Sequence, residues 1–120
     1  EKKGVMTLSS KEFKTKVYDI SAKNPEYLGS KPAIVDFYAS WCGPCRAISP
    51  VLEELAKEYG DKIVIYKVDV DASRDIAQAF GIRSIPAVLF IPMKGEAQMT
   101  VGGRSKEDFK KQIDTILLGK

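Results

Sequence analysis

IVDFYASWCGPCRAISP, residues 34–50, contains both cysteines of the chain, Cys42 and Cys45. The apolar run around its start, Ala33 to Ala39, is typical of a strand that is buried on both faces. From Pro44 to Tyr59 the apolar residues repeat at helical spacing, which predicts an amphipathic helix. The two cysteines are therefore expected where a buried strand turns into a helix.

Strand and helix patterns alternate outside this stretch as well. The predicted elements are a short edge strand at Val5–Leu8, a helix at Ser10–Asp19, a loop at Ser21–Lys31, a buried strand at Ile63–Val70, a helix at Ala72–Phe80, a hairpin of Ala87–Ile91 and Gln98–Val101 with Lys94–Gly95 in its turn, and a final helix after Ser105. Parallel units followed by an antiparallel hairpin predict an α/β fold, a mixed sheet with helices on both faces. No repeat or linker interrupts the pattern, so we expect residues 1–120 to form a single domain.

The composition is that of a globular protein and excludes several classes of function. Hydrophobic residues make up 44% of the chain and charged residues 29%, which argues against disorder. The net charge of +3 is spread along the chain, so we expect no nucleic-acid partner. No stretch is apolar for long enough to span a membrane.

The spacing of the two cysteines suits a reversible disulfide. Residues three apart on a helix lie on one face, with about 5–6 Å between Cβ atoms. A disulfide needs Cα atoms roughly 4.4–6.8 Å apart, so the pair can open and close with little movement. A bridge between such near neighbours constrains few unfolded conformations, because stabilisation grows with loop length. The pair is therefore predicted to be a redox-active disulfide rather than a structural one.

The start of the helix sets the predicted roles of the two thiols. The helix dipole and the free N–H groups stabilise a thiolate, so we expect Cys42 to be exposed, to have a lowered pKa and to attack substrate disulfides. Cys45, one turn inside, is expected to be more buried and to resolve the mixed disulfide. Pro44 is pre-organised for a helix start. The chain has no His, so no imidazolium lies between the cysteines, which favours a reductant.

Two other interpretations of the cysteines remain open. A zinc site needs about four ligands, which two Cys without His supply only if chains pair. Two inert buried thiols are the second alternative, although a WCGPC stretch at a strand-to-helix turn is a specific redox signal. Asp69 and Asp71 do not make a calcium loop, and we expect them to cap the following helix. We therefore expect no metal.

Asp36 interrupts the buried strand six positions before Cys42. Burial is expected to raise its pKa, so that it carries a proton near neutral pH and takes the proton of Cys45 directly or through water. Lys67, in the neighbouring strand, is its expected charge partner. The alternative is an Asp that caps a turn or reaches solvent at a strand end. Pro86 precedes another buried strand, and frequencies alone favour a trans bond there.

The sequence resembles the thioredoxin family over essentially its whole length from Val5. WCGPC matches the active-site motif of the family, VDFYA the preceding strand and GIRSIPAVLF the proline segment, while KVDVD and VGGRSKEDF follow in the expected order. The resemblance implies a thioredoxin fold, a five-stranded mixed sheet flanked by four helices. It also implies that Pro86 is cis and packed against the cysteines, and that Asp36 and Lys67 are the buried acid and its lysine.

The resemblance further implies a thiol–disulfide oxidoreductase that reduces protein disulfides. Its redox equivalents would be its own thiols, with no bound cofactor, and a reductase or a membrane electron donor would recharge it. We expect a monomer whose substrate adds as an extended segment near Ile85. The residues implied for the substrate groove are Trp41, Gly43, Pro44, Ile85, Pro86 and Gly102. A disulfide isomerase or oxidant, and a binding module without redox turnover, are the alternatives.

The chain departs from the common family pattern at several positions. Tyr38 replaces a more usual Trp, Ala87 a common Thr, and Arg46 a frequent Lys. The loop AKNPEYLGSKP is longer than in the shortest members and, with PMKGE, resembles the thioredoxins of Bacteroidetes-type bacteria, some of which are exported to the periplasm. The chain begins at Glu1 rather than Met, which either a removed signal peptide or a trimmed sequence would explain. We therefore favour a periplasmic location.

Overall fold

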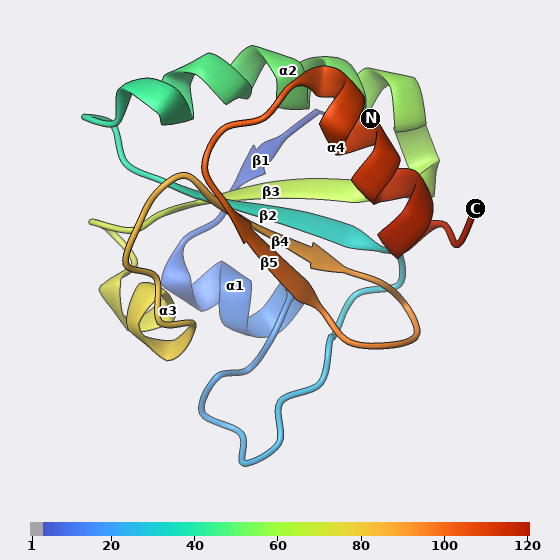
Figure 1. Cartoon of the computed structure of the whole chain (residues 1–120). Helices are drawn as coiled ribbons and strands as arrows, with labels where there is room; N and C mark the ends of the chain where they lie inside the picture. Colours follow the sequence, from blue (N-terminus) through green and yellow to red (C-terminus); the bar gives the residue numbers. More distant parts are fainter. Residues whose placement is uncertain (1–3) are drawn as a thin grey trace.

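The computed structural model describes residues 4–120, which form a five-stranded mixed sheet between two layers of helices (Figure 1). The strands are β1 (Met6–Thr7), β2 (Ala33–Tyr38), β3 (Val64–Asp69), β4 (Ala87–Ile91) and β5 (Gln98–Val101), in the order β1-β3-β2-β4-β5. The helices are α1 (Ser10–Lys16), α2 (Gly43–Tyr59), α3 (Arg74–Ala79) and α4 (Lys106–Gln112), with a 3₁₀ turn at Gly60–Lys62 and a π-helical turn at Ile113–Leu117. The predicted α/β architecture is confirmed.

The register of the central strands decides which side chains share a face. β3 pairs in parallel with both β1 and β2, whereas β4 pairs antiparallel with β2 and with β5. Asp36 of β2 lies opposite Lys67 of β3 on one side and opposite Val88 of β4 on the other. Side chains alternate between the faces of a strand, so these three residues face the same helical layer.

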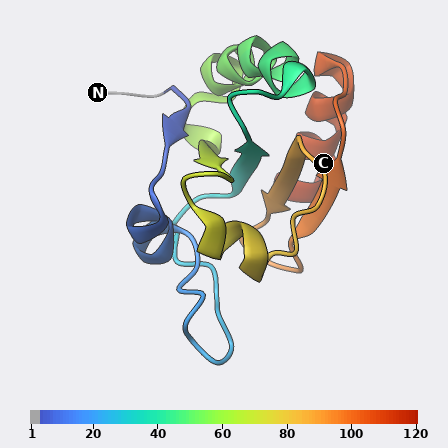
Figure 2. The same cartoon turned by 90° about the vertical axis from the view of Figure 1, so that its left-hand side faces the viewer.

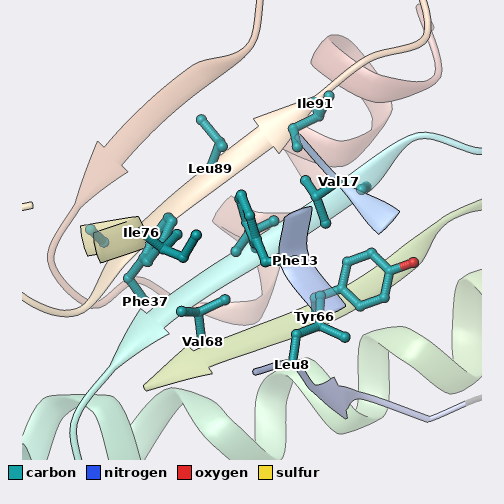
Figure 3. Close-up of a cluster of buried hydrophobic side chains, with 12 residues drawn as sticks. Leu8, Phe13, Val17, Phe37, Tyr66, Val68, Ile76, Leu89 and Ile91 are labelled. Atoms are coloured by element: carbon teal, nitrogen blue, oxygen red, sulfur yellow. The ribbon is translucent and has the colours of Figure 1, made fainter. Parts of the chain in front are cut away.

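Each face of the sheet carries its own apolar cluster. On the face covered by α1 and α3, Phe13 and Val17 pack with Phe37, Val68 and Ile76, as Figure 3 shows. On the opposite face the sheet packs against α2 and α4 (Figure 2), through the residues Ile34, Ile65, Val88, Phe90, Leu52, Leu55, Phe109 and Ile113. Most of these side chains are fully buried, which makes the sheet a rigid base for the loops at its end.

Serine side chains cap the first and the last of the α-helices. Ser9 accepts a hydrogen bond from the Glu12 N–H in a capping box, and Ser105 accepts one from the Asp108 N–H. Some predicted ends were too long: α1 stops at Lys16, α3 is confined to Arg74–Ala79, and β1 has two residues. No helix in the described part of the chain is long and apolar enough to cross a membrane.

Candidate active site at the start of α2

Cys42 and Cys45 are joined in a disulfide at the N-terminus of α2, with Cα atoms 5.3 Å apart. Cys42 is the N-cap of the helix, and its Sγ accepts a hydrogen bond from the Cys45 N–H at 3.2 Å. The Cys42 N–H donates to the Ala39 carbonyl at 3.1 Å, which fixes the turn between β2 and α2. The predicted placement of the pair is therefore confirmed, and the attacking sulfur position already receives a helix N–H.

The expectation that Cys42 is exposed was wrong for this disulfide-bonded form. Cys42 is 4% exposed and Cys45 is 3% exposed, so their burial barely differs. Both pack in a small cluster with Ala39, against the half-buried Val70 and Ile85. These two side chains come from the loops after β3 and before β4; the family resemblance implied Ile85 at the cysteines, whereas Val70 was not expected there. Figure 1 shows both loops on the side of the molecule where α2 begins.

Trp41 is the exposed apolar group beside the disulfide. Its indole is 67% exposed, and its Nε1–H donates to Asp71 Oδ2 at 2.9 Å. Asp71 therefore does not cap α3 as expected. Asp69 does not cap α3 either, because its Oδ1 accepts hydrogen bonds from the Asp71 and Ala72 N–H groups in the turn after β3, and the N-cap residue Ser73 makes no side-chain capping bond. The sequence analysis missed Asp71 as a site residue, since only the fold places it next to the indole.

The proline segment lies against the same disulfide. The bond between Ile85 and Pro86 is cis, as the family resemblance implied. The expectation of a trans bond, which rested on general frequencies, was wrong. The Gly102 N–H donates to the Pro86 carbonyl at 2.8 Å, and Gly102 has a φ of +96°, which favours glycine. Pro44 and Gly43 are exposed at the helix start. A Cβ at Gly43 would meet nothing within 4 Å, so an incoming chain finds open space there.

Asp36 lies under the helical layer and has no contact with solvent. Its side chain is 0% exposed, so the alternatives of a turn cap or a solvent-facing carboxylate were wrong. Among residues 4–120 neither carboxylate oxygen has a hydrogen-bond partner. Burial raises the pKa of Asp36 to about 6, and the positive charge of Lys67 lowers it in part. The group can therefore exchange a proton close to neutral pH.

Lys67 is the charge partner of Asp36 that the sequence analysis expected, but its ammonium is hydrogen-bonded to another residue. Its ammonium donates to Ser49 Oγ at 3.2 Å and lies 4.4 Å from the centre of the Tyr38 ring. Neither Asp36 oxygen accepts a hydrogen bond from it, so Lys67 acts on the carboxyl only through space. Ser49 was missed, although its position four residues after Cys45 places both on one face of α2.

A groove of about 500 Å³ opens beside this lysine. Its lining residues are Tyr38, Ala39, Ser40, Cys45, Arg46, Ser49, Pro50, Glu53 and Lys67. Arg46 closes one side by donating to the Ser40 carbonyl at 2.8 Å. The groove therefore brings solvent to the rear of Cys45, away from Trp41. Within residues 4–120 there is no cluster of three or more His, Cys, Asp or Glu side chains suited to a metal ion.

The arrangement defines the chemical class of the protein. Two cysteines that form a disulfide at a helix N-terminus can exchange two electrons with another disulfide through their own sulfurs, which makes the chain a dithiol–disulfide oxidoreductase. The thioredoxin family profile matches residues 4–115. The chain belongs to the thioredoxin family.

Similar proteins agree with this assignment over most of the chain. A thioredoxin of Borreliella burgdorferi is 42% identical over 109 residues, which are 90% of this chain and 93% of that protein. A thioredoxin of Chlorobaculum thiosulfatiphilum is 40% identical over 106 residues, 88% of this chain and 90% of that one. A solved structure of a chloroplastic thioredoxin z superposes with a TM-score of 0.80 at 25% identity and covers 94% of both chains. The fold is therefore the thioredoxin fold.

Proposed function

We propose that this thioredoxin reduces disulfides in protein substrates, with Cys42 as the attacking thiolate and Cys45 as the resolving thiol. The observation that supports these roles best is the hydrogen bond from the Cys45 N–H to Cys42 Sγ. Once the pair is reduced, the same helix N–H and the helix dipole would stabilise negative charge on Cys42. Cys45 has no equivalent position, because it already lies inside α2.

The reaction transfers two electrons and two protons from the pair to the substrate. The Cys42 thiolate attacks one sulfur of the substrate disulfide, the substrate S–S bond breaks, and a mixed disulfide forms. The released substrate thiolate takes up a proton. Cys45 then loses its proton and attacks Cys42 Sγ, which releases the second substrate thiolate and forms the Cys42–Cys45 disulfide. The substrate is reduced and the pair is oxidised.

Asp36 is the proposed acceptor of the Cys45 proton. Its pKa, raised to about 6 by burial, leaves it mostly ionised at neutral pH but basic enough to take a proton. It lies in β2, the strand that leads directly into the turn before α2. Transfer through a bridging water is the alternative route, since no hydrogen bond joins the two groups in the disulfide-bonded form.

The substrate is proposed to bind as an extended segment across the exposed edge of the disulfide. Trp41, Gly43 and Pro44 are exposed on one side of the pair, and Ile85 packs on the other. Pro86 and Gly102 are joined by a backbone hydrogen bond, which holds the floor of this surface. A backbone strand added beside Ile85 would place a substrate disulfide near Cys42.

The proposals on partners and compartment rest on the family and on the resemblance of two loops, and not on the geometry of the site. We propose that the chain works as a single-domain monomer, recharged by a thioredoxin reductase or by a membrane electron donor. The resemblance of AKNPEYLGSKP, residues 22–32, and of PMKGE to Bacteroidetes-type thioredoxins, some of which are exported, supports a periplasmic location. Expression of the full-length gene in a Gram-negative host, followed by fractionation and antibody detection beside a periplasmic and a cytosolic marker, tests this. Recovery with the cytosolic marker would contradict it.

The reduction potential of the Cys42–Cys45 couple tests the direction of the reaction. Equilibration against defined dithiol buffers is expected to give a value near about −270 mV, as for a reductant. A value of roughly −180 to −120 mV would instead support an isomerase or an oxidant. The double variant Cys42→Ser, Cys45→Ser should lose insulin reduction completely. A double variant that kept its function would identify a binding module.

A further inference from the structure

The Lys67 ammonium can reach two acceptors, the Asp36 carboxyl on the neighbouring strand and the Ser49 hydroxyl on α2. In the structure it binds the Ser49 hydroxyl. Lys67 and Asp36 are register partners on adjacent strands, so a lysine side chain is long enough to reach the carboxyl. The ammonium instead donates to Ser49 Oγ at 3.2 Å and lies 4.4 Å from the Tyr38 ring centre. It therefore faces the groove and not the buried acid.

Burial explains why this position is favoured. Asp36 is fully buried, whereas Lys67 is only half-buried and lines the groove. Moving the ammonium onto Asp36 would strip it of solvent, and the penalty for burying an ion is large. The Ser49 hydroxyl and the Tyr38 ring attract the cation while leaving it at the groove. Thr7, at the neighbouring edge of the sheet, interacts with the Tyr38 hydroxyl and helps to fix that ring.

We propose that Ser49 is a positioning residue, whose hydroxyl, together with the Tyr38 ring, keeps the Lys67 ammonium off the Asp36 carboxyl. This inference rests on the proposed function in one respect, the role of Asp36 as acceptor of the Cys45 proton. Ser49 takes no part in the sulfur chemistry. It acts on the reaction through Lys67, and Lys67 acts through Asp36.

Among the groups around Asp36, Lys67 is the one whose position affects the pKa of the carboxyl. On the groove side of Asp36 the charged and titratable groups are Lys67 and its neighbour Asp69 of β3, Tyr38 of β2, and Arg46 and Glu53 of α2, while β4 presents the apolar Val88 and Cys45 is held in the disulfide. Lys67 is the cation that lowers the pKa of Asp36. An ammonium held farther away lowers it less, so Asp36 remains a stronger base for the Cys45 proton.

Titration of Asp36 in the oxidised protein tests the proposal. Ser49→Ala removes the hydroxyl and suits a helix, so the variant should fold. Without the hydroxyl, the ammonium loses its hydrogen-bond acceptor at the groove and should lie closer to Asp36 on average, and a nearer opposite charge lowers the pKa of a carboxyl, by roughly one unit or more at close range. The carboxyl is followed by carbon-detected NMR over the pH range. Ser49→Thr keeps a hydroxyl at the same position and should titrate like the wild type.

A second background separates positioning from a general structural effect. In Lys67→Met the cation is absent, so adding Ser49→Ala should no longer move the pKa of Asp36. A pKa that does not fall in Ser49→Ala would overturn the proposal. So would an equal fall in the presence and absence of Lys67.

A kinetic measurement separates two claims, the positioning of Lys67 by Ser49 and the role of Asp36 as acceptor of the Cys45 proton. The rate at which Cys45 resolves a mixed disulfide is measured against pH for the wild type and for Ser49→Ala. A lower rate near neutral pH, with its acid limb shifted as the NMR titration shifts, supports both. A shifted NMR titration with an unchanged rate profile supports the positioning by Ser49 and removes Asp36 from the proposed mechanism.

Discussion

The indole N–H of Trp41 donates to Asp71 Oδ2 at 2.9 Å, across 30 residues of sequence. This bond ties the exposed residue before Cys42 to the loop that follows β3. The indole is 67% exposed, so little else restrains it, and the carboxylate sets its orientation. A large apolar group held still at the edge of the disulfide loses less entropy when a substrate binds than a mobile one.

Asp71→Ala is expected to weaken substrate binding without removing the redox chemistry. A hydrogen bond to a charged acceptor contributes on the order of 1 kcal/mol, so KM for a protein substrate should rise roughly 3- to 10-fold with little change in kcat. Trp41 is the only tryptophan in the chain, so fluorescence anisotropy reports its motion directly. Asp71→Asn keeps an acceptor oxygen and is the matched control. An unchanged anisotropy in Asp71→Ala would contradict the restraint.

The two cysteines are expected to differ sharply when substituted one at a time. Cys45→Ser leaves the attacking thiolate but no resolving thiol, so it should accumulate a mixed disulfide with the substrate. Cys42→Ser should accumulate far less, because its remaining thiol lies inside α2. Non-reducing gel electrophoresis after mixing with an oxidised protein substrate measures both. Stronger trapping by Cys42→Ser would reverse the assigned roles.

The parts of the fold that rest on local patterns could be predicted from the sequence. β2 and β4 were expected from unbroken apolar runs, and both lie in the centre of the sheet, where such runs belong. The end of α1 could not be predicted in the same way. Its apolar spacing continues to Ile20, but the Leu28 N–H donates to the Val17 carbonyl at 2.8 Å and draws the chain into a loop.

The same distinction holds for the active site. Cys42, Cys45 and Asp36 were identified because each residue type is unusual for its local setting. Ser49 and Asp71 were not, because their partners lie 18 and 30 residues away. Such contacts depend on strand register and on how a loop folds back, which no local pattern encodes. The contact of Val70 with the cysteines was missed for the same reason, whereas Ile85 was placed beside them only through the family resemblance.

Asp36→Asn is expected to stabilise the oxidised protein at neutral pH. Burial raises the pKa of Asp36 from 3.8 to about 6, so the folded protein keeps a proton there that the unfolded chain releases. The stability that this proton provides is complete below about pH 4 and is lost as the pH rises to about 6 and beyond. The amide stays neutral, so the variant avoids a loss of up to roughly 3 kcal/mol.

Urea unfolding of wild type and Asp36→Asn across this pH range measures the difference. The free energy of unfolding of the variant relative to the wild type should be highest above about pH 6 and should fall to a constant value toward about pH 4. The amide has its own burial cost, which does not change with pH. The prediction is therefore tested by how the difference in unfolding free energy changes with pH, and not by its size at a single pH. A difference that is the same at every pH would show that Asp36 titrates normally.

Gly102 and Gly43 provide a matched pair of substitutions on the two sides of the disulfide. Gly102 has a φ of +96°, and its N–H donates to the Pro86 carbonyl, so an alanine there is strained wherever its side chain points. Gly102→Ala should lower the free energy of unfolding by about 1–3 kcal/mol. A Cβ at Gly43 meets nothing within 4 Å, so Gly43→Ala should change stability by less than about 0.5 kcal/mol. Thermal unfolding of both oxidised variants measures this. Equal losses in the two variants would mean that the backbone at Gly102 relaxes without strain.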